Sequence, residues 1–206
     1  MLDYTLLLIF IPTFLLVSAT PGMCMTLALT LGMSIGIRRT FWMMWGEMVG
    51  VALVSVLAVI GVASLMLNYP NIFNFFKYLG GSYLIYIGVQ QWLMRGKMTI
   101  NHNQNKAMVS GKKLMLQGFI TAIANPKGWA FTISLLPSFI NPELAITPQL
   151  LALVVIILCS EFLFMTLYAT GGKSLAKILG KSHNIRLLNR VSGSLMILIG
   201  LWLALG

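Results

Sequence analysis

Long apolar runs, separated by short polar stretches, recur along the whole chain. A run of roughly 20 apolar residues matches the ~30 Å hydrocarbon core of a bilayer at a rise of about 1.5 Å per helical residue. Only 9% of the 206 residues are charged and 58% are hydrophobic, so a water-soluble domain of this composition would lack the charges to cover its surface. The sequence therefore predicts an all-α membrane protein that lies in a lipid bilayer.

The apolar runs predict six transmembrane helices. The expected ranges are 4–37, 41–67, 72–94, 114–140, 147–171 and 187–205. One straight helix over the first range would be about 50 Å long, which is too long for the bilayer. Pro21 has no N–H group, its ring collides with the carbonyl group of Val17, and Gly22 lets the backbone turn. We therefore expect the first helix to break at this point.

The basic residues predict the orientation of the chain in the membrane. Twelve of the 14 Lys and Arg residues lie in or beside alternate loops, and the loops around 68–71 and 141–147 have none. The positive-inside rule places the basic loops in the cytoplasm and both termini outside, in the periplasm. The net charge of +10 is thus explained by topology and not by binding to nucleic acid. The twelve residues are Arg38, Arg39, Arg95, Lys97, Lys106, Lys112, Lys113, Lys173, Lys177, Lys181, Arg186 and Arg190.

Two correspondences within the sequence predict an internal repeat. Residues 77–88 align without gaps with residues 189–200, at an offset of 112, and share a Gly-Ser pair, two Ile and the final Gly. Pro21 in the first helix likewise corresponds to Pro126 in the fourth helix, at an offset of 105. A chance pair of prolines in two long helices is the alternative interpretation. Because each half holds an odd number of helices, a repeat would insert the second half upside down.

The predicted organisation is therefore two inverted three-helix repeats within one membrane domain. The first repeat covers 1–94, a polar cytoplasmic linker covers 95–113, and the second repeat covers 114–206. The first and fourth helices are both expected to be broken at their proline-containing motifs. Inverted repeats with broken helices in corresponding positions are typical of secondary transporters.

The two breaks are the predicted substrate site. Backbone groups left unpaired at membrane depth are tolerated only where protein or a water-filled cavity receives them. A helix N-terminus attracts a carboxylate and a helix C-terminus attracts a cation, so a pair of breaks suits a zwitterion. The candidate residues at the breaks are Pro21, Gly22, Asn125, Pro126, Lys127 and Gly128.

Three ionisable residues in the apolar ranges add to this prediction. Glu161 lies about 14 residues into the fifth predicted helix, where a charge is costly. It either binds a substrate ammonium and couples transport to protons, or holds two helices together as a neutral hydrogen-bonding group. Lys127 binds a substrate carboxylate or neutralises Glu161, unless it extends along its helix to the cytoplasmic face. Glu47 either acts in proton coupling in a cytoplasmic vestibule or forms an interfacial ion pair beside Arg38 and Arg39.

Other chemistries find little support in the sequence. Both histidines, His102 and His183, fall in predicted cytoplasmic loops, so no Ser–His pair or HExxH metal site forms within the membrane. No dense cluster of Cys, His or carboxylates suggests a metal site, and no cofactor is expected. Cys24 and Cys159 lie in apolar ranges and are interpreted as packing residues. We do not expect an enzyme.

The motifs together resemble the LysE/RhtB family of amino-acid exporters, in its homoserine/threonine efflux-like branch, over nearly the whole chain. The resemblance rests on residues 18–22 followed by Gly32, Gly36 and Arg38, on 77–88, on 125–127 with 137–140, and on Glu161. Two positions depart from the family pattern. Met23 replaces a second proline, and Val51 stands where many members carry an Asp, with Glu47 one turn earlier on the same helix face.

The resemblance implies a function and a location. It implies antiport, in which protons drive the efflux of small amino acids or their derivatives across the inner membrane of a bacterium. A homodimer is the default expectation for the assembly. The alternative is a membrane-embedded scaffold or accessory subunit without transport activity. The sequence does not name the amino acid.

Overall fold

The computed structural model describes residues 3–68, 70–93, 110–141, 143–179 and 182–205. All regular elements in these ranges are helical. Residues 95–109 of the expected linker 95–113 lie outside the described residues. The elements are α1 Tyr4–Ala19, α2 Met23–Ile35, α3 Ile37–Asn68, α4 Pro70–Leu93, α5 Gly111–Ala124, α6 Pro126–Leu135, the 3-10 turn η1 Leu136–Phe139, α7 Ile146–Leu179 and α8 Ser182–Leu205.

The helices are suited to a membrane. Within the described ranges, Ile37–Gly61 of α3 and Ile146–Gly172 of α7 are each long and apolar enough to cross a bilayer. The pair α1 and α2 makes a third span if its two helices, which meet at a bend of 55°, count as one. The predicted all-α class is confirmed, and its apolar spans fit a membrane protein.

Both helix breaks occur where the prolines predict them. The helix α1 ends at Ala19 and α2 begins at Met23, while α5 ends at Ala124 and α6 begins at Pro126. Pro126 takes the first position of α6, where its missing N–H group costs no hydrogen bond. A third turn, at Gly36 between α2 and α3, has a φ of +80°, which favours glycine. Nothing lies within 4 Å of a Cβ built at Gly36, so this glycine serves the turn and not close packing.

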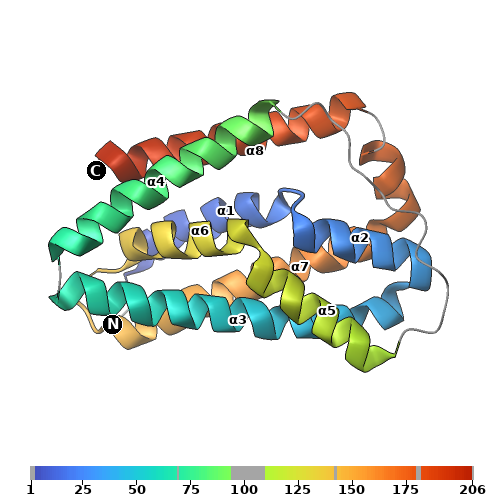
Figure 1. The fold of residues 1–206 in the computed structure, drawn as a ribbon, viewed down its shortest axis with the longest axis horizontal. Coiled ribbons are helices and arrows are strands. Elements are labelled where there is room, and N and C mark those ends of the chain that lie inside the picture. The colour runs from blue at the N-terminus through green and yellow to red at the C-terminus, as the bar shows by residue number, and fades with distance from the viewer. Residues whose placement is uncertain (1–2, 69, 94–109, 142, 180–181, 206) are drawn as a thin grey trace.

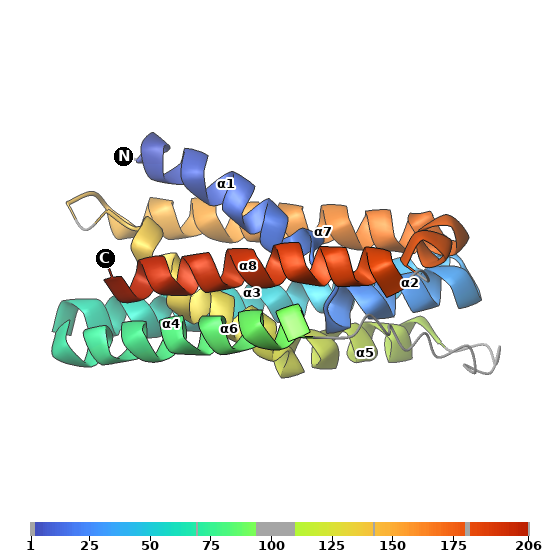
Figure 2. The same cartoon turned by 90° about the horizontal axis from the view of Figure 1, so that it is seen from above.

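The helices run roughly along one axis as an elongated bundle (Figures 1 and 2). The two chain termini lie at one end, which we call the terminal end, as both views show. The junction between α2 and α3 and the start of α5 lie at the opposite end. The helices α4 and α8 run side by side along one flank of the bundle.

Glycines bring the helix backbones of α4 and α8 close together. A Cβ at Gly88 would lie 2.7 Å from the carbonyl oxygen of Gly193, and a Cβ at Gly200 would lie 2.6 Å from that of Gly81. The two contacts are antiparallel, because the residue number rises on α4 as it falls on α8. Small residues that let backbones approach closely are common at the contacts between membrane helices.

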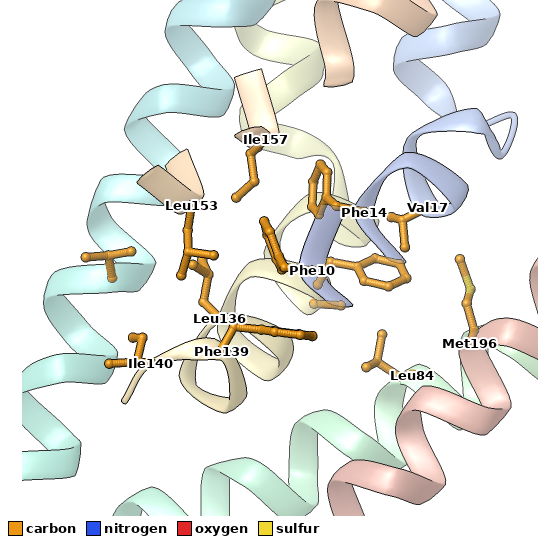
Figure 3. Close-up of a cluster of buried hydrophobic side chains, with 13 residues drawn as sticks. Phe10, Phe14, Val17, Leu84, Leu136, Phe139, Ile140, Leu153, Ile157 and Met196 are labelled. Carbon is orange, nitrogen blue, oxygen red and sulfur yellow. The ribbon is translucent and has the colours of Figure 1, made fainter. Parts of the chain in front are cut away.

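An apolar cluster fills the bundle between the breaks and the terminal end (Figure 3). Phe10 of α1 is 1% exposed, and its ring lies 5.5 Å from that of Phe14 and 4.9 Å from that of Phe139. Leu153 and Ile157 of α7 belong to the same cluster. It fixes α1 against η1 and α7, and so holds the C-terminal end of α1 in place at the first break.

Candidate functional site

The two helix breaks face the same cavity, of about 40 Å³. At roughly 10–15 Å³ for each water molecule, this volume accommodates a few waters. The polar lining residues are Ser18, Thr20, Cys24, Ser55, Asn125, Lys127, Thr132 and Glu161. The remaining lining residues are apolar or glycine: Phe14, Val17, Gly22, Met25, Val51, Val54, Ala122, Gly128, Phe131 and Ile157.

Lys127 joins the two breaks. Its ammonium group donates hydrogen bonds to the carbonyl oxygens of Val17, at 2.7 Å, and Thr20, at 3.2 Å. These carbonyls lie at the C-terminal end of α1, where the helix dipole favours a cation. The side chain of Lys127 therefore enters the cavity from α6, and does not extend along its own helix to the end of the bundle.

The N-termini of α2 and α6 differ in how they are capped. The Asn125 side chain accepts a hydrogen bond of 3.1 Å from the backbone N–H group of Lys127, so it caps α6. The N-cap residue of α2 is Gly22, which has no side chain to offer. A Cβ built at Gly22 would lie 3.9 Å from the Lys127 Nζ atom, so the uncapped helix end and the ammonium group are close together.

Glu161 lies in the middle of α7 and faces the same cavity. The hydroxyl group of Ser18 donates a hydrogen bond of 3.0 Å to its Oε1 atom. This bond links α7 to the last turn of α1, as the interpretation of Glu161 as a group that joins two helices requires. Glu161 and Lys127 also interact electrostatically across the cavity. The cavity thus contains Lys127, which is positive when protonated, and Glu161, which is negative when ionised.

Glu47 lies beside this cavity and does not line it. Its side chain is 0% exposed, and neither carboxyl oxygen has a geometrically ideal hydrogen bond within the described part of the chain. The thiol of Cys24 is its polar neighbour, and Glu47 lies close enough to Glu161 for an electrostatic interaction. An interfacial ion pair beside Arg38 and Arg39 does not fit a carboxyl group buried in this way.

The structure brings most of the predicted site residues together. Gly22, Asn125, Lys127, Gly128 and Glu161 all line the cavity. Pro21 and Pro126 form the breaks themselves and are absent from its lining.

The sequence did not indicate that three further residues lie at the cavity or at the first break. Cys24, interpreted as a packing residue, lines the cavity, and its Sγ atom accepts a hydrogen bond of 3.1 Å from Asn125 Nδ2. Ser55 lines the cavity. Tyr168 donates a hydrogen bond of 2.9 Å to the carbonyl oxygen of Ala19. No motif in the sequence points to Ser55 or Tyr168.

Comparisons with known proteins extend over most of the chain. A 29% identical relative, the homoserine/homoserine lactone efflux protein of Salmonella typhimurium, aligns over 92% of this chain and 91% of its own length. The leucine efflux protein of Klebsiella pneumoniae is 30% identical over 77% of this chain and 79% of its own. A membrane protein of Vibrio cholerae is 26% identical over 98% of both chains. No solved structure matches. Residues 15–206 match the family described as LysE type translocator, and the chain belongs to that family.

Proposed function

We propose that this protein exports small amino acids or their derivatives across the inner membrane of a bacterium, in exchange for protons. The observation that carries the proposal is the shared cavity of Lys127 and Glu161 at two broken helices. Ionisable groups within apolar helices are costly, and they usually mark the route of a substrate or a proton. The family and the efflux proteins among the relatives support the same function.

The substrate is a zwitterion that both charges bind. Its carboxylate meets the uncapped N-terminus of α2 at Gly22, where the first N–H groups have no partner within the helix. Lys127 lies beside this helix end and assists. The ammonium group of the substrate binds Glu161 and displaces the Ser18 hydroxyl group from it.

The coupling proton competes with the substrate for Glu161. Since one carboxylate cannot hold both a proton and an ammonium group, release of one favours binding of the other. Glu47 is the second member of this pathway. An ionised carboxylate at its position, without an ideal hydrogen bond, would cost several kcal/mol in desolvation, so Glu47 holds a proton between transport steps.

Two inverted repeats, 1–94 and 114–206, provide the alternation of access. Gly81 and Gly88 align in sequence with Gly193 and Gly200. The spatial contacts are the crossed pairs, Gly81 with Gly200 and Gly88 with Gly193. Crossed contacts between equivalent residues are what a two-fold axis between α4 and α8 produces, and they support six spans in two inverted halves.

The end of the bundle opposite the termini faces the cytoplasm in this proposal. It holds the first turn of α3, which carries Arg38 and Arg39, and the first turn of α5, which carries Lys112 and Lys113. The positive-inside rule supports this orientation. A cavity of about 40 Å³ has room for water but requires the helices to separate before an amino acid enters, as in rocking of one half against the other.

Glu161→Gln tests the proposal. Purified protein is reconstituted in proteoliposomes, and the counterflow of radiolabelled amino acids is measured with and without an imposed pH gradient. We expect the variant to lose proton-driven export by at least tenfold, because its amide neither binds a proton nor attracts an ammonium group. Glu143→Gln is the matched control, since Glu143 is exposed in the loop before α7 and its change should leave transport intact.

Undiminished, proton-coupled export by the Glu161→Gln variant would remove Glu161 from the mechanism. The scaffold alternative makes a different prediction, that the wild-type protein moves none of the amino acids in the panel.

A further inference from the structure

The hydroxyl group of Ser55, in the wall of the cavity, has no hydrogen-bond partner in the part of the chain that the structure describes. Ser55 is 0% exposed and lines the cavity, and its Oγ atom forms no hydrogen bond among the described residues. An unpaired hydroxyl group in a protein interior is unfavourable, because it has lost its hydrogen bonds to water and gained none in return. The position is therefore unfavourable for the fold unless another molecule occupies the cavity and pairs with it.

Other hydroxyl groups in these helices avoid this cost. Thr30, Thr121 and Thr132 each donate a hydrogen bond of 2.7–2.8 Å to the carbonyl oxygen four residues earlier. This local bond is the usual solution for a serine or threonine within a helix. Ser55 has the same type of carbonyl one turn earlier, at Val51, and makes no bond to it.

The surroundings of Ser55 indicate which part of a substrate would reach it. The neighbouring lining residues on α3, Val51 and Val54, are apolar, as is Ile157 of α7. The groups suited to an α-carboxylate and an α-ammonium, Lys127 and Glu161, come from α6 and α7. With both main-chain groups of an amino acid bound there, its side chain is the part left to contact α3.

From this arrangement, and on the basis of the proposed function, we propose that Ser55 determines specificity by forming a hydrogen bond with a hydroxyl group on the side chain of the transported amino acid. Amino acids of this kind fit the resemblance to the homoserine/threonine efflux-like branch, and the inference assigns the recognition of their side-chain hydroxyl group to Ser55. Val51, Val54 and Ile157 contact the hydrocarbon part of that side chain. A site that pairs with a substrate hydroxyl discriminates against an analogue that lacks it, because the analogue leaves the buried protein group unpaired.

Two isosteric pairs of amino acids test this role. Threonine and valine differ by the exchange of a hydroxyl for a methyl group, and homoserine and norvaline differ in the same way. Proteoliposomes with the wild-type protein should transport threonine and homoserine with the higher kcat/KM. In Ser55→Ala the preference within each pair should fall by about tenfold, as expected for the loss of one hydrogen bond of ~1.4 kcal/mol.

Two further variants separate specificity from folding. Ser55→Thr retains the hydroxyl group and should restore the preference. Ser34→Ala is the matched control, because Ser34 lies on α2 away from the cavity, with its hydroxyl group 3.4 Å from the carbonyl oxygen of Leu31. It should keep the wild-type preference.

The outcomes distinguish this inference from the proposed function. If the wild-type protein transports amino acids and Ser55→Ala leaves both preferences unchanged, Ser55 serves only to bind water and the inference is overturned, while the proposed function stands. If the wild-type protein transports no amino acid, the proposed function fails and the inference fails with it.

Discussion

Substitution of Gly46 by alanine tests the packing of α3 against α5. A Cβ at Gly46 would overlap the carbonyl oxygen of Met115 and lie 2.6 Å from its carbonyl carbon. Both atoms belong to the backbone of α5, so no side chain can rotate to make room. The two helices must therefore move apart, and the contacts around this point must loosen with them.

Gly61 provides an internal reference on the same helix. A Cβ built at Gly61 has nothing within 4 Å, so Gly61→Ala adds only the helix propensity of alanine, about 1 kcal/mol. Gly46→Ala gains the same propensity but also suffers overpacking of about 1–3 kcal/mol. Because the propensity gain cancels in the comparison, Gly46→Ala should be less stable than Gly61→Ala by about 1–3 kcal/mol.

Thermal unfolding of both variants in lipid nanodiscs measures this difference. For a chain of this length, each 1 kcal/mol shifts the Tm by about 2–4 °C, so the two melting temperatures should be clearly separated. Equal melting temperatures for the two variants would show that α3 and α5 do not pack as closely as the structure indicates.

Two further predictions concern Lys127 and Asp3. Lys127→Met should lower the rate of export at least tenfold. If both residues bind one substrate as proposed, the double variant Lys127→Met with Glu161→Gln should export as fast as the slower of the two single variants. A double variant whose loss equals the two single losses combined would contradict this. The pKa of Asp3, which precedes the first span, is lowered from its ordinary value of 3.8, first by the hydrogen bond from the Asn141 side chain and then by that from the Leu6 backbone. The stabilisation by ionised Asp3 is therefore present above pH 3.8 and is lost as the pH falls through the lowered pKa. The Tm difference between wild type and Asp3→Ala should shrink as the pH falls below 3.8, and a difference independent of pH would contradict this.

The helix breaks could be predicted from the sequence because their cause is local. A proline removes one N–H group and obstructs one carbonyl group, and an apolar run longer than the bilayer is thick requires an interruption. The confirmed breaks at Pro21 and Pro126 follow from these two facts. The depth of Glu161 in its helix and the position of Lys127 directly after Pro126 were also predictable, since both follow from spacing along the sequence.

The partners of these residues could not be predicted, because they come from distant parts of the chain. Lys127 binds carbonyl groups 107 and 110 residues earlier, and Ser18 binds Glu161 across 143 residues. The unpaired hydroxyl group of Ser55 was equally hidden, since a serine within a helix normally bonds to its own backbone.

Under the proposed function, the position of Lys127 gives substrate binding a direct mechanical consequence. In the structure its ammonium group satisfies the carbonyl oxygens of Val17 and Thr20 at the end of α1. A substrate carboxylate that draws the ammonium group toward Gly22 would deprive these carbonyls of their donor. An ammonium group that draws Glu161 away from Ser18 would remove a second restraint on α1. Since both restraints act on the end of α1, one zwitterion would release that helix end. If the substrate binds as proposed, binding and movement of α1 would be coupled through the side chains of Lys127, Glu161 and Ser18.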